Sequence, residues 1–404
     1  MSERIIIIGA GHAAGQAVAA FKQRKFAGKI VLVGEEPYLP YQRPPLSKKF
    51  LAGDMPPERL YFKPPGFYED PNIDVRLKTR VTVINPDRHR VSTSAGDIIV
   101  YDKLILATGS SARRLPVDGV DLAGVHYLRS IDDVNRIRAE IDRAQRVVIV
   151  GAGYIGLEVA AVIRQLGLDV TVLEMADHVM SRVVSPQVSA FYETEHIAHG
   201  VKLMLSTGLA AFRGNDRVGC VETTDGQTVA ADLVIIGVGI VPNTELASAA
   251  GLNVDDGIVV DDRCRTSDPD IYAIGDCTSH PNRIYDRRVR LESVHNALEQ
   301  AKTAAANITG DDVRYTQVPW FWSDQYDLKL QIAGLSSGYD QVLLRGDPSH
   351  RSFACLYLKD GRLLAVDGIN SPHDFMQSKA LIANRATPDP RRLVDTGVAL
   401  KDLA

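Results

Sequence analysis

The chain has 404 residues, a formal net charge of −4 and a pI near 6.2. This length allows two or three domains with full cores, and the mild acidity argues against a broad nucleic-acid-binding surface. No segment offers the roughly 18 uninterrupted apolar residues of a spanning helix, and residues 1–21, although superficially like a signal peptide, fit a strand and a turn better. We therefore expect a cytoplasmic protein that binds neither membrane nor nucleic acid.

The N-terminal segment predicts a strand over 4–9, a helix over 12–24 and a strand over 29–34. Gly9, Gly11 and Ala14 stand between the first strand and the helix in a GxGxxA pattern. In a dinucleotide-binding turn, the first glycine allows the tight turn, the second allows the backbone to approach a pyrophosphate, and the third small residue allows close helix packing. Glu35 follows the second strand, where an acid can accept a hydrogen bond from a ribose hydroxyl.

A Pro-rich loop at 38–45 and several short strands between 75 and 101 follow. The apolar run from Lys103 ends in Ala107, Thr108 and Gly109. Small residues at a strand end allow the backbone to approach a ligand closely, although a plain core strand has the same pattern.

The same fingerprint recurs 142 positions after Gly9, with Gly151, Gly153 and Gly156 between the run 147–150 and a predicted helix. Glu174 ends the next predicted strand, 18 residues beyond the third glycine. Such an acid binds a ribose 2′-hydroxyl and repels a 2′-phosphate, and no arginine stands immediately beside it. The two copies predict two dinucleotide sites, of which the second favours NADH over NADPH.

The rest of the chain predicts a helix around 186–199, several strands over 201–238, strands at 258–260 and 271–276, and a helix over 291–308. From Pro319 onward, short alternating runs surround an Asp360-Gly361 turn and precede a helix over 372–383. The predicted fold is α/β, with two Rossmann-like dinucleotide-binding domains and a C-terminal α+β domain. We expect a discontinuous first dinucleotide-binding domain at 1–112 and 241–319, a second at 113–240 and the C-terminal domain at 320–404.

The chain resembles the NADH-dependent ferredoxin reductases, the family that includes putidaredoxin reductase and the reductases of aromatic-ring dioxygenases. The resemblance spans essentially the whole chain and is carried by these motifs: IIIIGAGHAAG at 5–15, YQRPPLSK at 41–48, ATG at 107–109, VGAGYIGLE at 150–158, IYAIGDC at 271–277, LESVHNALEQA at 291–301 and PWFWSDQY at 319–326. It implies an FAD-containing enzyme that passes electrons from NADH through the flavin to a small acidic 2Fe–2S ferredoxin. In this family the ferredoxin serves a cytochrome P-450 type monooxygenase or a ring-hydroxylating dioxygenase.

The resemblance implies two Rossmann-like domains of the glutathione-reductase type, of which the discontinuous domain at 1–112 and 241–319 is the FAD-binding domain and the domain at 113–240 is the NADH-binding domain. It also implies roles for individual residues. It assigns the FAD site to Gly9, Gly11, Ala13, Ala14, Glu35, Arg43, Lys48, Val81, Ala107, Thr108, Gly109, Arg129, Asp276, Val294 and Trp322. It assigns the NADH site to Gly151, Gly153, Tyr154, Ile155, Gly156, Glu158, Glu174 and Gly239. Lys48 and Glu158 are the expected catalytic residues, because a cation near the flavin stabilises the charge of its reduced form and a carboxylate can hold that lysine. On sequence alone, a solvated lysine is the better interpretation of Lys48, and an ordinary helical acid is the better interpretation of Glu158.

Arg290, Lys302 and Lys329 are candidate contacts for an acidic ferredoxin, and Trp322 is a candidate for a position between the flavin and a docked cluster. Plain surface cations and core tryptophans are the alternative interpretation.

Two other functions remain open. A rubredoxin reductase would use the same two cofactors with a one-iron acceptor, and a protein of the apoptosis-inducing-factor type would use them as a conformational switch. A disulfide reductase is disfavoured, because the four cysteines, Cys220, Cys264, Cys277 and Cys355, form no CxxC pair. Their spacing also predicts no disulfide framework and no metal site.

Overall fold

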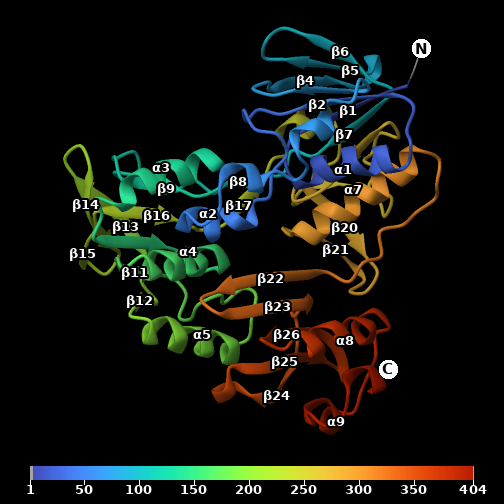
Figure 1. Ribbon diagram of the computed structural model, residues 1–404. Coiled ribbons are helices and arrows are strands. Elements are labelled where there is room, and N and C mark those ends of the chain that lie inside the picture. The colour runs from blue at the N-terminus through green and yellow to red at the C-terminus, as the bar shows by residue number, and fades with distance from the viewer. Residues whose placement is uncertain (1–2, 404) are drawn as a thin grey trace. The chain divides into compact units, whose positions relative to one another are not determined.

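The computed structural model describes residues 3–403 and divides into two compact units (Figure 1). The first unit contains residues 1–43, 57–111 and 241–319, and the second contains 44–56, 112–240 and 320–404. Strands β8 (Ser110–Ala112) and β17 (Ile240–Pro242) lie where the chain passes from one unit to the other. The segment 44–56, which we had expected within the FAD-binding domain, is grouped with the second unit.

A five-stranded parallel sheet of order β19-β7-β1-β2-β3 forms the centre of the first unit. Its strands are β1 (Arg4–Ile8), β2 (Lys29–Val33), β3 (Ile73–Arg76), β7 (Lys103–Leu106) and β19 (Ile271–Ala273). Alternate residues of β1 face opposite sides of the sheet. Ile5 and Ile7 pack with helices α1 (His12–Gln23) and α7 (Val294–Ile308), whereas Ile6 and Ile8 pack with a second, antiparallel sheet.

That antiparallel sheet contains β4 (Val81–Asn85), β5 (Arg90–Thr93) and β6 (Ile98–Val100). The remaining elements of the unit are short: α6 (Glu245–Ala249), the strands β18 (Ile258–Val259), β20 (Thr278–Asn282) and β21 (Arg287–Val289), and 3₁₀ turns at Pro57–Leu60, Pro65–Tyr68 and Pro86–Arg88.

The second unit repeats this plan. Its parallel sheet has the order β12-β11-β10-β16-β9 and contains β9 (Val125–Tyr127), β10 (Arg146–Val150), β11 (Asp169–Leu173), β12 (Lys202–Met204) and β16 (Leu233–Ile236). Its antiparallel partner contains β13 (Leu209–Gly214), β14 (Val218–Thr223) and β15 (Thr228–Ala230). The helices are α2 (Lys49–Ala52), α3 (Ile131–Ile141), α4 (Tyr154–Gln165) and α5 (Pro186–Ala198), with a 3₁₀ turn at Pro44–Ser47. Each glycine fingerprint therefore lies in the first turn of a βαβ unit, and the two units have the same arrangement.

A five-stranded antiparallel sheet of order β22-β23-β26-β25-β24 follows in the second unit. Its strands are β22 (Trp320–Gln325), β23 (Leu328–Gly334), β24 (Gln341–Asp347), β25 (Ser352–Lys359) and β26 (Arg362–Ile369). Helix α8 (Pro372–Ala383) packs on β23 and β26, and α9 (Pro390–Val394), with 3₁₀ turns at Pro348–His350 and Leu400–Leu403, completes the chain. The predicted turn at Asp360-Gly361 joins β25 to β26, and both residues have positive φ, as a tight hairpin requires.

The predicted α/β fold is confirmed, with small differences at element ends. The helix expected over 291–308 begins at Val294, and the strand expected over 271–276 ends at Ala273. Within residues 3–403, no helix is long and apolar enough to cross a membrane.

Candidate functional site

The first glycine turn joins β1 to α1. Gly9 has φ +112°, and a Cβ atom added to it would lie 2.1 Å from the carbonyl oxygen of Ala107. A Cβ atom added to Gly11 would meet no protein atom within 4 Å, and no side chain caps α1 at this residue. The turn thus leaves open space at an uncapped helix N-terminus, which is what a pyrophosphate requires.

Other predicted FAD residues of the first unit gather around this turn. A Cβ atom added to Gly275, next to Asp276, would lie 3.2 Å from Cβ of Ala13, and Asp276 accepts a hydrogen bond from Ser110 Oγ at 2.8 Å. Thr108 Oγ1 donates to the carbonyl oxygen of Asn243 at 2.7 Å. The turn, the ATG segment and Asp276 therefore lie together at the carboxyl ends of β1, β7 and β19.

Glu35 also follows the carboxyl end of its strand, and its side chain is 62% exposed and paired with Arg80 at 2.6 Å. The neighbouring acid Glu36 forms an ion pair with the predicted residue Arg43 at 2.9 Å. The sequence analysis did not predict this pair. The remaining predicted FAD residues lie as follows: Ala14 is buried in α1, Val81 begins β4, Val294 begins α7, and Arg129 belongs to the second unit, just before α3.

The second glycine turn joins β10 to α4 in the same way. Gly151 has φ +101°, and a Cβ atom added to Gly156 would lie 2.0 Å from the Gly151 carbonyl oxygen. Gly153 again faces open space, and no side chain caps α4 there. Glu174 lies at the end of β11 and accepts hydrogen bonds from the backbone N–H groups of Ala152, at 2.7 Å, and Ala176, at 2.9 Å. The carboxylate is therefore fixed beside the glycine turn, where a ribose would lie.

The other predicted NADH residues lie around the second turn. Ile155 is 42% exposed although it is apolar and belongs to the first turn of α4. The ring of Tyr154 packs against that of Phe321 with centroids 4.7 Å apart. Gly239 has φ +98°, and its carbonyl oxygen accepts a hydrogen bond from Arg113 N–H at 3.0 Å.

Replacing Gly153 with alanine tests this site. The new methyl group would contact no protein atom, so we expect the fold and FAD content to be retained while the KM for NADH rises about tenfold through crowding at the pyrophosphate, a cost of about 1.4 kcal/mol. Gly156→Ala is the contrasting variant, because its methyl group would overlap backbone and should lower the melting temperature. Steady-state kinetics and thermal unfolding distinguish the two, and an unchanged KM in Gly153→Ala would contradict the assignment.

Lys48 and Glu158 form an ion pair within the second unit. Lys48 Nζ lies 2.7 Å from Glu158 Oε2, and the side chains are 18% and 2% exposed. Ser47 Oγ donates to the same carboxylate oxygen at 2.5 Å, and Ser323 Oγ donates to Oε1 at 2.8 Å. Glu158 is thus a buried carboxylate with a defined set of donors, not the exposed acid of an ordinary helix. The two serines were not predicted as site residues.

The tryptophans of β22 line a cavity of 400 Å³. Trp320, Trp322 and Asp324 face it, together with Lys329 and Gln331 of the paired strand β23. The two indole rings lie 5.3 Å apart, and Lys379 Nζ lies 4.7 Å from the centroid of the Trp320 ring. Trp320 and Trp322 are each partly exposed.

Of the candidate docking residues, Lys329 lies at this cavity, whereas Lys302 belongs to α7 and pairs with Glu299 at 2.6 Å. Arg290 is paired with Asp256 at 3.0 Å and with Glu292, and its side chain is 17% exposed. Arg290 is therefore less available to a partner than its sequence position suggests.

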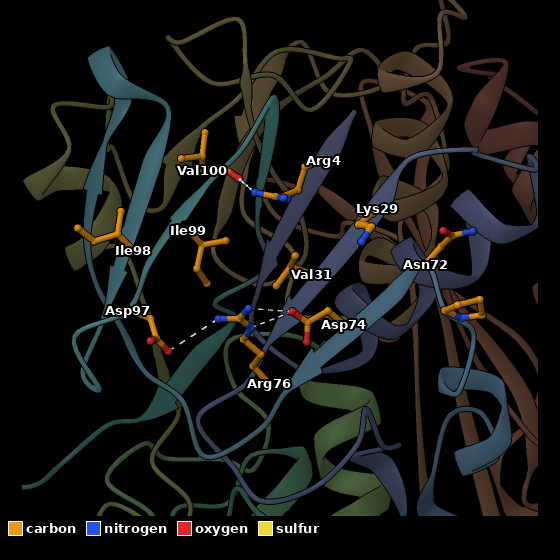
Figure 2. Close-up of a pocket in the computed structure, with 11 residues that line it drawn as sticks. Arg4, Lys29, Val31, Asn72, Asp74, Arg76, Asp97, Ile98, Ile99 and Val100 are labelled. Carbon is orange, nitrogen blue, oxygen red and sulfur yellow. Dashed lines mark hydrogen bonds and ion pairs between the residues drawn. The ribbon is translucent and has the colours of Figure 1, made fainter. Parts of the chain in front are cut away.

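A further cavity, of 440 Å³, lies on the first unit (Figure 2). Its lining includes Arg4 and Lys29, at the amino ends of β1 and β2, and none of the residues of the glycine turn. Arg76 ion-pairs with Asp74 at 2.9 Å and lies 3.8 Å from Asp97, and Arg4 Nη1 donates to the Val100 carbonyl oxygen. Because most of its charged groups bind one another, we assign it no ligand.

The four cysteines are unpaired. Burial raises the pKa of the thiols of Cys264, Cys277 and Cys355, which makes them poor nucleophiles. Among residues 3–403, no group of three or more histidine, cysteine or acidic side chains is arranged to hold a metal ion.

Two βαβ units with open, uncapped glycine turns and an acid at each second strand define a protein of the two-dinucleotide oxidoreductase class. The chain belongs to the pyridine nucleotide-disulphide oxidoreductase family, whose model matches residues 3–301. A reductase C-terminal domain model matches residues 320–404. The chain is an oxidoreductase, and this family uses FAD and NAD(P)H.

Known relatives match almost the full length of the chain. The 5,5′-dehydrodivanillate O-demethylase ferredoxin reductase subunit of a Sphingobium species is 44% identical, over 98% of this chain and 97% of its own. The solved structure of the covalent putidaredoxin reductase–putidaredoxin complex matches with a TM-score of 0.96 and 43% identity, covering 99% of this chain and 98% of that one. A rubredoxin-NAD(+) reductase of Pseudomonas putida is 40% identical, over 91% of this chain and 96% of its own. The predicted resemblance to ferredoxin reductases is confirmed.

Proposed function

We propose that the chain is an NADH:ferredoxin reductase that delivers electrons to a 2Fe–2S ferredoxin, and through it to a cytochrome P-450 type monooxygenase or a ring-hydroxylating dioxygenase. The observation that carries the proposal is that the two faces of β22 contribute to two different sites. One face of this strand presents Ser323 to the Lys48–Glu158 pair, and the other presents Trp320 and Trp322 to a surface cavity. Strand β22 thus connects two sites. The buried charged pair is suited to hydride transfer, and the aromatic surface is suited to binding an electron-accepting protein.

The residues of the two glycine turns fit the cofactors that the family uses. Gly9, Gly11, Ala13, Ala14 and the neighbouring Asp276 would hold FAD, with Glu35 at its ribose. Gly151, Gly153, Gly156 and Glu174 would hold NADH. When bound, FAD accepts a hydride from NADH and releases the electrons one at a time.

The protein contributes position and charge to this chemistry. Lys48 would place its ammonium group beside the flavin and stabilise the negative charge that reduction adds, while Glu158 holds Lys48 in place. Each glycine turn would fix one dinucleotide, and holding the reacting groups in position is the main catalytic requirement of hydride transfer.

The electron acceptor distinguishes this function from a rubredoxin reductase, which the 40% identical relative favours as the second candidate. With NADH in excess, we expect at least one of a panel of 2Fe–2S ferredoxins to be reduced about tenfold more efficiently than rubredoxin, because recognition depends on charge and shape at the docking surface. A preference for rubredoxin would overturn the proposal. Reduction of ferricyanide without that of any protein acceptor would favour a switch of the apoptosis-inducing-factor type.

Lys329→Glu tests whether the tryptophan-lined cavity is the docking surface. We expect ferredoxin reduction to slow about tenfold through charge repulsion, with ferricyanide reduction unchanged. Lys202→Glu, at the exposed first residue of β12, is the control. Equal slowing of both acceptors would indicate damage to the flavin site and contradict a role in docking.

A further inference from the structure

A chain of hydrogen bonds runs from the surface of the second unit to Glu158. Tyr326 Oη donates to His196 Nδ1 at 3.2 Å, and His196 Nε2 donates to Gln325 Oε1 at 2.8 Å. Gln325 Nε2 donates to Ser323 Oγ at 3.2 Å, and Ser323 Oγ donates to Glu158 Oε1 at 2.8 Å. The four bonds connect α5, the end of β22 and α4.

The protonation states of His196 and Tyr326 fix the direction of donation in this series of hydrogen bonds. Burial lowers the pKa of His196 to about 4, with a smaller opposing effect from its bond to Gln325, so that the ring is neutral and carries a single proton near pH 7. Burial also raises the pKa of Tyr326, which keeps its proton. An amide oxygen only accepts, so His196 must donate from Nε2 and accept at Nδ1. Each group therefore donates toward Glu158.

The side chains that form this series of hydrogen bonds are buried, and burial restricts their orientations. Ser323, Gln325 and His196 are fully buried, and Glu158 is 2% exposed. A buried polar group without a partner is costly, so each side chain is restricted to the orientation that satisfies its neighbour. Ser323 engages Oε1 of Glu158, while Ser47 and Lys48 engage Oε2. Because both oxygens have partners, the carboxylate group of Glu158 is held in one orientation.

We propose that Ser323, Gln325 and His196 are positioning residues that hold the Glu158 carboxylate in one orientation against Lys48, and so set both the affinity of the site for the nicotinamide ring and the reduction potential of the flavin. The inference rests on the proposed function, because it assigns Lys48 and Glu158 to the flavin–nicotinamide site. It extends that site along β22 to α5.

Ser323→Ala in the FAD-loaded protein tests the inference. The change removes the donor to Oε1, so we expect the Kd for NAD⁺, measured by perturbation of flavin absorbance, to rise about fivefold, and flavin reduction by NADH to slow about tenfold. The flavin midpoint potential should shift as well. Ser323→Thr, which keeps the hydroxyl group, should restore all three values. Ser378→Ala is the matched control, because this buried serine of α8 donates only to the Phe375 carbonyl oxygen.

A double-mutant comparison distinguishes positioning from general destabilisation. In a Glu158→Ala background, Ser323→Ala should change the Kd for NAD⁺ by less than about twofold and leave the midpoint potential unchanged, because Ser323 then has no side-chain acceptor at position 158. Equal effects in both backgrounds, or no effect in the wild type, would overturn the inference. If Ser323→Ala does not fold, Tyr326→Phe removes the outermost donor and should produce smaller shifts in the same direction; unchanged values would again overturn the inference. A wild-type flavin that NADH fails to reduce would instead refute the proposed function.

Discussion

Lys48→Met is expected to slow the reduction of bound flavin by NADH about a hundredfold, because it removes the positive charge proposed to lie beside the flavin. The methionine keeps most of the volume of the lysine stem. It leaves Glu158, 2% exposed, with hydrogen bonds from Ser47 and Ser323 but without its counter-charge. Loss of one partner from a buried ion pair costs about 3 kcal/mol, so the melting temperature should fall too. Stopped-flow absorbance measures the first effect, and thermal unfolding measures the second.

The adjacent Lys49 supplies the matched control for this change. It is exposed and follows Lys48 directly in the sequence. Lys49→Met should leave both the rate of flavin reduction and the melting temperature within measurement error. If Lys48→Met lowers the melting temperature but reduces its flavin as fast as Lys49→Met, the ion pair has no role in hydride transfer and Lys48 is a scaffold residue.

Glu174→Arg is expected to lower kcat/KM for NADH about a hundredfold, equivalent to about 2.7 kcal/mol, and to raise the efficiency with NADPH. The reason is local. Glu174 is fixed at the end of β11 by the N–H groups of Ala152 and Ala176, and so presents a negative charge where the adenosine ribose would bind. An arginine there would lose the bonds to the ribose hydroxyls and attract a 2′-phosphate. Steady-state kinetics with both nucleotides measure the change.

Glu174→Gln separates charge from hydrogen bonding. The amide oxygen can still accept from Ala152 N–H, so we expect a smaller loss with NADH and no preference for NADPH. An unchanged NADH preference in Glu174→Arg would show that another part of the site selects the nucleotide.

The fold was largely predictable because its strongest signals are local. Each fingerprint lies within a single βαβ unit, so the glycines, the following helix and the acid at the second strand are all close in sequence. Helix α8 was predicted with its observed bounds, and α1 and α5 to within one residue at their C-terminal ends. By contrast, β20 was missed because its sequence, TSHPN, is polar and contains proline while most of its residues are buried.

The charged site was only partly predictable, because it depends on contacts between distant segments. Ser47 and Ser323 donate to Glu158 across 111 and 165 residues of sequence. A serine in a Pro-rich loop and another in an aromatic strand carry no local sign of this shared acceptor. Lys48, Glu158 and their pairing could be named from the family resemblance, but the burial of the two side chains could not. The alternation of β22 offered one usable signal, because it places residues 320, 322 and 324 on one face and 321, 323 and 325 on the other.

The most direct test of the central claim is an anaerobic titration of the purified holoprotein with NADH, followed by a 2Fe–2S ferredoxin, while flavin and iron–sulfur absorbance are recorded. The account predicts that one equivalent of NADH bleaches the flavin band and that the reduced protein then transfers one electron to each of two ferredoxin molecules, restoring the oxidised flavin spectrum. A flavin that stays oxidised under NADH would contradict the account. So would a reduced flavin that no 2Fe–2S ferredoxin reoxidises.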